Sequence, residues 1–334
     1  MINLKYRRIL VLGSNSFTGS NYINDTLKKN NKIVGVSRSN EYSSIMLPYK
    51  QNKNIKNFKF VKLDLNINLD KLFNLINKFK PDLIVNFAAQ GEVRNSWNYP
   101  EQWYRTNCNL VVNLTNWLVK NKYLKRYISI STPEVYGSNI NKIKESNYFN
   151  PSTPYAASKL AGDLHLITLN KKYNFPVIFT RSANVYGVGQ QLYRIIPKTI
   201  ISIKKNNKLQ LHGGGISKRS FIYVSDVTEA INRVINMGNP GEVYHVSNDK
   251  LYSIKNIVSK ICKKFNKNLH DVVDIVNENY GQDNIYRLNS DKIRKELSWT
   301  DKIDINDGID KTVSWIDKNW KNISKMSHNY IHKI

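Results

Sequence analysis

The chain has 334 residues, 41% of them hydrophobic, so it can bury a large core and is too apolar for a disordered protein. A formal net charge of +26 would suit nucleic acid or a membrane surface, but the lysines are dispersed and form no single patch. We attribute the charge to a composition rich in Lys, Asn and Ile. No stretch approaches the roughly 20 apolar residues that span a bilayer, so neither nucleic acid nor a membrane is expected as a partner.

The two cysteines, Cys108 and Cys262, form no CxxC pair and lie in apolar, helix-like stretches. A disulfide framework is therefore not expected, which fits a reducing cytoplasm. The apolar run at residues 9–12 follows basic residues but is too short for the apolar region of a signal peptide, and it is typical of a first β-strand. The sequence thus predicts a cytoplasmic protein.

Apolar runs rich in β-branched residues alternate with helical patterns through the first half of the chain. One helix is expected to begin near Phe17, and another places Trp103, Leu110, Leu114 and Leu118 at helical spacing. Such alternation predicts a parallel sheet with helices on both faces. The predicted strands span residues 9–12, 33–36, 58–63, 83–87, 127–131 and 177–180.

The first predicted strand runs directly into a turn of small residues and then into the start of a helix. Backbone N–H groups in such a turn, together with the helix N-terminus, suit a pyrophosphate, although an ordinary strand-to-helix turn is the alternative. The usual spacing is GxxGxxG, and Ser16 stands here at the middle position, where its hydroxyl can donate to a phosphate. The residues expected to bind a dinucleotide are Gly13, Asn15, Ser16, Phe17, Thr18 and Gly19.

The end of the second strand indicates which dinucleotide is bound. An acid at this position would bind the ribose hydroxyls of NAD, but the sequence has Ser37 and Arg38. Arg38 can pair with a 2′-phosphate that Ser37 also hydrogen-bonds, which favours NADP; the alternative is a solvent-exposed loop arginine. Further cofactor contacts are expected after the third and fourth strands, at Asp64, Leu65, Phe87, Ala88 and Ala89.

The second half of the chain holds one more predicted strand, at residues 243–246, and helical stretches at 254–265 and 309–320. We predict an α/β fold, a Rossmann-type doubly wound parallel sheet with a smaller, mainly C-terminal substrate-binding lobe. Residues 1–187 form the NAD(P)-binding domain, to which the strand near 243–246 returns, and residues 188–334 form the lobe.

A hydroxyl residue after the fifth strand and a YxxxK pair form the candidate catalytic set. Thr153 is expected to cap a helix whose first residue is Pro154, which puts Tyr155 and Lys159 on one helical face. The nearby ammonium should lower the pKa of the phenol and make it a competent base. YxxxK alone also describes a surface helix pair, but Thr132 about twenty positions earlier makes the combination specific.

These motifs resemble the extended short-chain dehydrogenase/reductase family over nearly the whole chain. Within that family the similarity is closest to nucleotide-sugar 4,6-dehydratases, the dTDP-glucose 4,6-dehydratase type in particular. The matching segments are residues 131–137, 154–159, 184–187, 219–226 and 280–283.

The resemblance implies a tightly bound NAD(P)+ and a nucleotide-diphosphate sugar substrate, with Thr132, Tyr155 and Lys159 around the sugar C4 and the nicotinamide. The dTDP-glucose type favours NAD, whereas the residues after the second strand favour NADP. Paired hydrogen bonds from an arginine suit the substrate diphosphate. The expected substrate-binding residues are Gln90, Ser96, Asn184, His212 and Arg219, with His212 equally explained as a surface histidine.

Glu134 distinguishes the possible reactions, because dehydratases of this type carry Thr-Asp-Glu or Thr-Ser-Glu here while 4-epimerases usually lack the glutamate. Oxidation at C4 acidifies the C5 proton, which a carboxylate can remove before water leaves from C6. The sequence therefore predicts a 4,6-dehydratase with Glu134 as the C5 base. The alternative for Glu134 is an exposed loop carboxylate or a salt-bridge partner.

Several departures leave other reactions open. Pro133 occupies the general-acid Asp position, so Glu134 or a water would have to supply the acid, and Glu92 and Arg94 replace a His and an Asp of the sugar loop. Gln90 and Ser96 resemble GDP-mannose 4,6-dehydratase instead. UDP-glucuronate decarboxylases also use a Thr-Ser-Glu turn. A 4-epimerase, a decarboxylase-like enzyme and a non-catalytic relative acting as a scaffold or sensor remain alternatives.

No metal site is expected. His328 and His332 have HxxxH spacing, but no acid or cysteine lies beside them, so a frayed, solvated tail is predicted. The helix from Trp103 to Leu118 and the helix from Tyr155 carry apolar surface beyond what one sheet face needs. In the resembled family the equivalent helices of two subunits pack as a four-helix bundle, which implies a homodimer.

Overall fold

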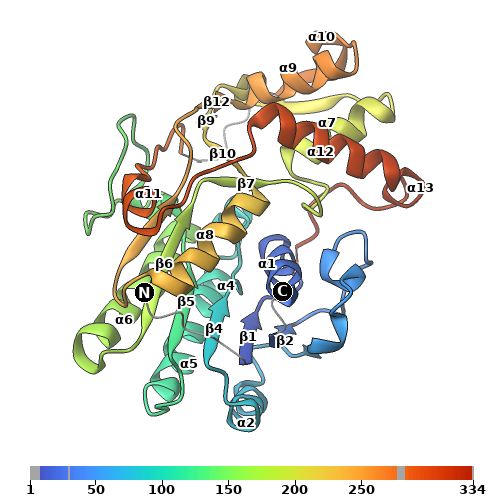
Figure 1. Cartoon of the computed structure of the whole chain (residues 1–334). Coiled ribbons are helices and arrows are strands. Elements are labelled where there is room, and N and C mark those ends of the chain that lie inside the picture. Colours follow the sequence, from blue (N-terminus) through green and yellow to red (C-terminus); the bar gives the residue numbers. More distant parts are fainter. Residues whose placement is uncertain (1–7, 29–30, 277–282, 333–334) are drawn as a thin grey trace.

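The computed structural model describes residues 8–28, 31–276 and 283–332. At its centre lies a seven-stranded sheet, parallel throughout, in the order β11-β6-β5-β4-β1-β2-β3 (Figure 1). The order reverses on the two sides of β1 and β4, so the predicted doubly wound α/β fold is confirmed. The strands are β1 (Arg8–Leu12), β2 (Lys32–Ser37), β3 (Phe58–Lys62), β4 (Leu83–Asn86), β5 (Arg126–Ile130), β6 (Val177–Ser182) and β11 (Val243–Val246).

Helices bury both faces of the sheet, which is why its central strands are continuous apolar runs. One face packs against α1 (Phe17–Leu27), α8 (Val224–Met237) and α11 (Asp291–Leu297). The other packs against α2 (Leu69–Phe79), α5 (Leu110–Leu118) and α6 (Pro154–Tyr173). Besides the predicted strand β11, the helices α8 and α11 thus return from the second half of the chain to the sheet.

A separate hydrophobic core lies in the remaining part of the second half of the chain. Two small sheets contribute to it, β7 (Asn184–Tyr186) with β10 (Phe221–Tyr223), and β8 (Leu209–His212) with β13 (Val273–Val276). A third small sheet pairs β9 (Lys218–Arg219) with β12 (Tyr252–Ser253). The helices of this core are α7 (Ile195–Lys204), α9 (Ile254–Lys264), α10 (Leu269–Val272), α12 (Ile305–Lys318) and α13 (Trp320–Ile323).

The helix expected from Trp103 to Leu118 is interrupted. Between α4 (Pro100–Tyr104) and α5 lies a π-helical turn, Arg105–Asn109. Asn107 in this turn is buried; its amide donates to the Gln90 carbonyl and to Ser158 Oγ, at 3.1 and 3.0 Å. The wider turn lets this side chain join the loop after β4 to α6, a contact between distant segments that helical spacing cannot reveal.

A buried ion pair joins α6 to β6 beneath the carboxyl end of β5. Arg181 Nη2 lies 3.1 Å from Asp163 Oδ2, and neither side chain exceeds 2% exposure. Ser131 Oγ donates to the same carboxylate oxygen, and Arg181 donates to the Tyr136 hydroxyl. His245 of β11 meets that hydroxyl at 2.9 Å, and burial lowers the pKa of its imidazole to about 3.

In the part of the chain that the structure describes, no helix is long and apolar enough to cross a membrane.

Arg181→Met should lower the free energy of unfolding by about 3–5 kcal/mol, because the Asp163 carboxylate stays buried without its counter-charge. Lys28→Met, which breaks the exposed Lys28–Asp25 pair, is the matched control and should cost less than about 1 kcal/mol. Urea unfolding followed by tryptophan fluorescence measures both. Equal losses in the two variants would contradict this account of the buried pair.

Candidate active site

The turn between β1 and α1 packs tightly against the end of β4. Gly13 has a φ of +78°, and a Cβ there would lie 2.7 Å from the Ala88 nitrogen. A Cβ on Gly19 would lie 2.6 Å from the Gly13 carbonyl oxygen, so both outer positions of the motif require glycine. The middle position tolerates Ser16 because this residue caps α1: its Oγ accepts from the Gly19 N–H at 3.1 Å.

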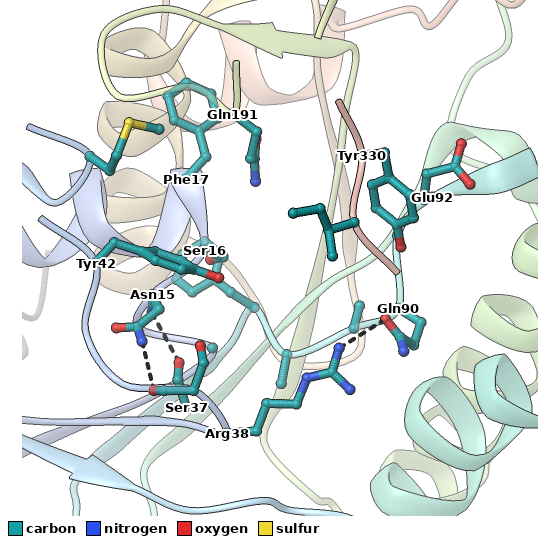
Figure 2. A pocket seen from close by; sticks show the side chains of 18 of the residues that line it. Asn15, Ser16, Phe17, Ser37, Arg38, Tyr42, Gln90, Glu92, Gln191 and Tyr330 are labelled. Atoms are coloured by element: carbon teal, nitrogen blue, oxygen red, sulfur yellow. Dashed lines mark hydrogen bonds between the residues drawn. The ribbon is translucent and has the colours of Figure 1, made fainter. Parts of the chain in front are cut away.

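A cavity of about 660 Å³ opens from this turn along the carboxyl ends of β2, β3 and β4 (Figure 2). Most residues predicted to bind the dinucleotide line it, together with Gln90 of the sugar loop. Four other residues predicted to bind the dinucleotide do not line it, namely Thr18, Gly19, Tyr155 and Lys159. The predicted residues that the cavity brings together are Gly13, Asn15, Ser16, Phe17, Ser37, Arg38, Asp64, Leu65, Phe87, Ala88, Ala89 and Gln90.

Ser37 and Arg38 lie differently within this cavity. The Ser37 hydroxyl is buried, accepts from the Asn15 N–H at 3.0 Å and lies 3.3 Å from the Ser14 hydroxyl, so it supports the turn. The Arg38 guanidinium reaches across the cavity floor toward Gln90, with 3.5 Å between Nη2 and Oε1 (Figure 2). Of the two, the arginine is therefore the better placed to meet a ligand in the cavity.

Thr132, Tyr155 and Lys159 meet at the carboxyl end of β5. The Thr153 hydroxyl accepts from the Ala156 N–H at 3.1 Å, which confirms the predicted cap of α6 with Pro154 as its first residue. Thr132 hydrogen-bonds Tyr155. Lys159 is buried and its Nζ donates to the Ile130 carbonyl at 2.8 Å. The predicted set is thus brought together, with the ammonium held on the backbone of β5.

The electrostatics of Tyr155 differ from the expectation. Burial raises the pKa of the phenol, and the charge of Glu134 adds to this, while the Thr132 hydrogen bond and Arg194 lower it. The net direction is upward, so the expectation that Lys159 sets a lowered pKa is wrong for this arrangement. The lysine is itself desolvated, and burial lowers the pKa of its ammonium.

Glu134 lies among charged groups from distant segments. Burial raises the pKa of its carboxyl to about 7; Arg219 and Arg194 oppose the rise, and Asp283 adds to it. Asp283 is almost fully buried, with one oxygen accepting from Ser152 Oγ at 2.8 Å and the other without a partner in the described residues. A carboxyl near pKa 7 can take up or release a proton at neutral pH.

Arg219 and Asn184 converge on Tyr286, which the sequence analysis missed. The Arg219 guanidinium stacks 4.6 Å above the Tyr286 ring and donates to the carbonyls of Lys218, Asp283 and Asn284. The Tyr286 hydroxyl donates to Asn184. The one available signal was position, since Tyr286 lies three residues after the recognised segment 280–283, of which only Asp283 is described.

Of the predicted substrate-binding residues, Gln90 lines the cavity, whereas Ser96, Asn184, His212 and Arg219 do not. Ser96 is fully buried in α3 (Val93–Asn98), where its hydroxyl turns back to the Val93 carbonyl at 2.6 Å. His212 is exposed at the end of β8 and does not line the cavity. Local helix geometry and the strand direction decide these orientations, and neither is readable from a motif.

The prediction of a solvated C-terminal tail is wrong. The His332 ring stacks on Trp103 and Tyr99, with centroids 5.6 and 5.1 Å apart, and residues upstream of it line the cavity. Two aromatic rings of α4 and its cap provide the surface that holds the tail. A pattern of histidine spacing carries no information about this long-range packing.

The parallel sheet, the glycine turn after β1 and the Thr132, Tyr155 and Lys159 set define the extended short-chain dehydrogenase/reductase class. Within that class the chain belongs to the family described as GDP-mannose 4,6 dehydratase, which it matches over residues 10–312. It is 31% identical to human dTDP-D-glucose 4,6-dehydratase over 334 residues, which is 96% of this chain and 93% of that protein.

Solved structures of similar fold agree with this family assignment. The dTDP-glucose 4,6-dehydratase of Streptomyces venezuelae, solved with NAD bound, matches this chain with a TM-score of 0.87 and 26% sequence identity. The match covers 95% of this chain and 100% of that chain. The UDP-glucuronic acid 4-epimerase of Bacillus cereus, 24% identical, has a TM-score of 0.81 over 93% and 99% of the two chains. The second likeness shows the fold alone, so the fold does not separate dehydration from epimerisation.

Gly13→Ala should destabilise the protein by about 1–3 kcal/mol, because a side chain at this φ is strained and its Cβ meets the backbone of Phe87 and Ala88. Gly91→Ala is the control: it also lines the cavity, but its Cβ would meet nothing within 4 Å. Urea unfolding of the two variants tests this, and a Gly13→Ala protein as stable as Gly91→Ala would refute the packing argument.

Proposed function

We propose that this protein is a nucleotide-sugar 4,6-dehydratase that forms an NDP-4-keto-6-deoxy sugar. The observation that carries the proposal is Glu134, a half-buried carboxyl whose pKa desolvation raises to about 7 and which acts electrostatically on Tyr155. An epimerase needs only the oxidation and reduction at C4, which Thr132, Tyr155 and Lys159 serve. A dehydratase additionally needs a base for C5, and Glu134 supplies one. The human relative described above is a dehydratase.

The reaction balances as an internal redox with loss of water. C4 is oxidised to a ketone with release of its hydroxyl proton, the C5 proton is removed, the C6 hydroxyl leaves as water, and hydride returns to C6 while a proton is delivered to C5, which balances the proton released at C4. A bound NAD(P)+ supplies the hydride acceptor and donor, and its positive charge when oxidised favours a phenolate. The residues that line the large cavity from Gly13 to Ala89 suit such a dinucleotide, with the turn at its diphosphate.

The residues divide the proton transfers between them. Tyr155 takes the C4 hydroxyl proton, Thr132 orients that hydroxyl, and Lys159 stays fixed on the Ile130 carbonyl. Glu134 takes the C5 proton and, because Pro133 has no proton to give, hands a proton to the departing C6 hydroxyl. A carboxyl with a pKa near 7 is suited to both steps.

The substrate diphosphate is assigned to Arg219 and Asn184. Among the described residues, three of the five N–H groups of the guanidinium donate to backbone carbonyls, and the other two suit a phosphate. These hydrogen bonds to backbone carbonyls fix the orientation of the planar guanidinium group. We place the sugar-nucleotide between the sheet and the second hydrophobic core, so that residues 188–334, apart from α8, β11 and α11, act as the substrate-binding lobe.

The alternatives are a 4-epimerase, a UDP-glucuronate-decarboxylase-like enzyme and a non-catalytic relative. Glu134 opposes the first and the assembled catalytic set opposes the last, whereas a decarboxylase also uses a glutamate in this turn and is distinguished by its substrate and by loss of CO2 in place of water. We also propose a homodimer, supported by exposed apolar side chains on α3, α4 and α6, namely Trp97, Tyr104 and Leu164. The two free cysteines support a cytoplasmic location.

The purified protein, incubated with dTDP-, GDP-, UDP- and CDP-hexoses, should give a product with a C6 methyl group by NMR. Glu134→Gln should keep the first hydride transfer but lose C5 deuterium exchange by about 10²–10⁴-fold, whereas Tyr155→Phe should lose both. Because the Glu134 carboxyl ionises near pH 7, wild-type exchange should rise from about pH 6 to pH 8.

Near wild-type product formation by Glu134→Gln would overturn its assigned role. Inversion at C4 as the sole wild-type reaction would favour the epimerase. Loss of the carboxylate from UDP-glucuronate, tested as an additional substrate, would favour the decarboxylase.

The choice between NAD and NADP rests on opposing observations. The solved Streptomyces relative contains NAD, whereas Arg38 and the lack of an acid after β2 favour NADP. A charge-assisted contact of about 1.5–3 kcal/mol predicts that Arg38→Ala weakens NADP binding about 10- to 100-fold and spares NAD. Lys62→Ala, an exposed charge at the end of β3 that does not line the cavity, is the control. Unchanged NADP affinity in Arg38→Ala, measured by titration calorimetry, would decide for NAD.

A further inference from the structure

The last described residues of the chain run from the second hydrophobic core, across the cavity, to the helices that cover the central sheet. They leave α13 and end beside α4, two elements that are far apart in sequence. Five of them line the same cavity as the glycine turn, and Figure 2 shows Tyr330 facing it on the side opposite Asn15 and Tyr42. The five are Met326, Ser327, Asn329, Tyr330 and Ile331.

The far end of this segment is anchored by His332. Its ring lies nearly parallel to those of Trp103 and Tyr99, with interplanar angles of 1° and 10°. His332 Nε2 also lies 2.8 Å from Gln102 Oε1, so two stacked rings and a hydrogen bond hold one side chain. These partners lie in α4 and at its N-cap. The helix α4 packs against α6, which covers one face of the central sheet.

The near end is anchored in the other core. Met326 packs against the cluster that contains α7 and α12. The Tyr330 ring meets the edge of Tyr193, in the segment before α7, with centroids 5.2 Å apart and an interplanar angle of 79°. The segment is thus fixed to both cores and spans the opening between them.

Tyr330 stands among charges that face the cavity. Glu92 raises and Arg38 and Arg194 lower the pKa of its phenol, although burial and Tyr193 dominate and raise it to about 12. Below that pH the hydroxyl keeps its proton and can donate it to an anionic oxygen. The opposite wall is the turn whose N–H groups suit a diphosphate.

We propose that residues 326–332 form a strap that is part of the dinucleotide-binding site, with Tyr330 facing the diphosphate and adjacent ribose and His332 as its anchor. The proposal rests on the proposed function, because a dehydratase returns its hydride within each turnover and has no need to release the dinucleotide. A strap fixed to both cores slows dissociation, since the ligand can leave only after the stacked rings separate. Ligand retention of this kind appears mainly in the dissociation rate.

The test compares His332→Ala and Tyr330→Ala with wild type and with His270→Ala, which removes an exposed histidine of α10 far from the cavity. Each full-length protein is loaded with labelled NAD or NADP and separated from free ligand. It is then diluted into an excess of the same dinucleotide without label, and the loss of label from the protein is followed with time. We expect both tail variants to lose the dinucleotide about tenfold faster than wild type, since each removes ring contacts. The His270→Ala rate should match wild type.

Two controls are measured in parallel: the unfolding temperature of each ligand-free protein, and its affinity for a free nucleoside diphosphate. Neither should differ between the tail variants and wild type. Wild-type dissociation rates in both tail variants would overturn the strap. Faster dissociation accompanied by an equally lowered unfolding temperature of the ligand-free protein would also overturn it, because general destabilisation would then suffice. A wild-type protein that binds neither NAD nor NADP would instead refute the proposed function itself.

Discussion

The Arg181 guanidinium is fully buried, and the Asp163 carboxylate is the group that balances its charge. Asp163 lies one helical turn after Lys159 on α6, and it accepts from Ser131, the residue before Thr132. The pair therefore sets the distance between α6 and the carboxyl end of β5, where the lysine and the threonine must meet. A buried charge without its partner costs several kcal/mol, so this geometry has little freedom.

Desolvation, more than any single neighbour, decides the chemistry above that pair. It raises the pKa of both Glu134 and Tyr155; the charge of Asp283 adds to the rise at Glu134, and the charge of Glu134 adds to the rise at Tyr155. A carboxyl near pKa 7 beside a phenol that holds its proton suits a site where proton transfers happen in sequence. Pro133 leaves Glu134 as the single carboxyl group in this turn.

Two hydrophobic cores frame the site, and residues far apart in the chain meet beside it. Arg219 and Tyr286 come from the second half of the chain and meet Asn184 of β7. The C-terminal segment spans the same gap from the other side. Separating the cores would have to break the contacts of the C-terminal segment, so ligand exchange and the packing of the cores are physically linked.

The sequence by itself determined the doubly wound sheet, the turn at Gly13, the cap at Thr153 and the grouping of Tyr155 with Lys159. These follow from local rules, namely the strand and helix periods and the conformations that glycine and proline allow. Only the tertiary structure decided that Ser37 supports the turn, that Tyr286 joins the site, that His332 stacks on α4 and that the pKa of Tyr155 moves upward. Each of these depends on burial or on contacts between residues far apart in the chain, which no local pattern encodes.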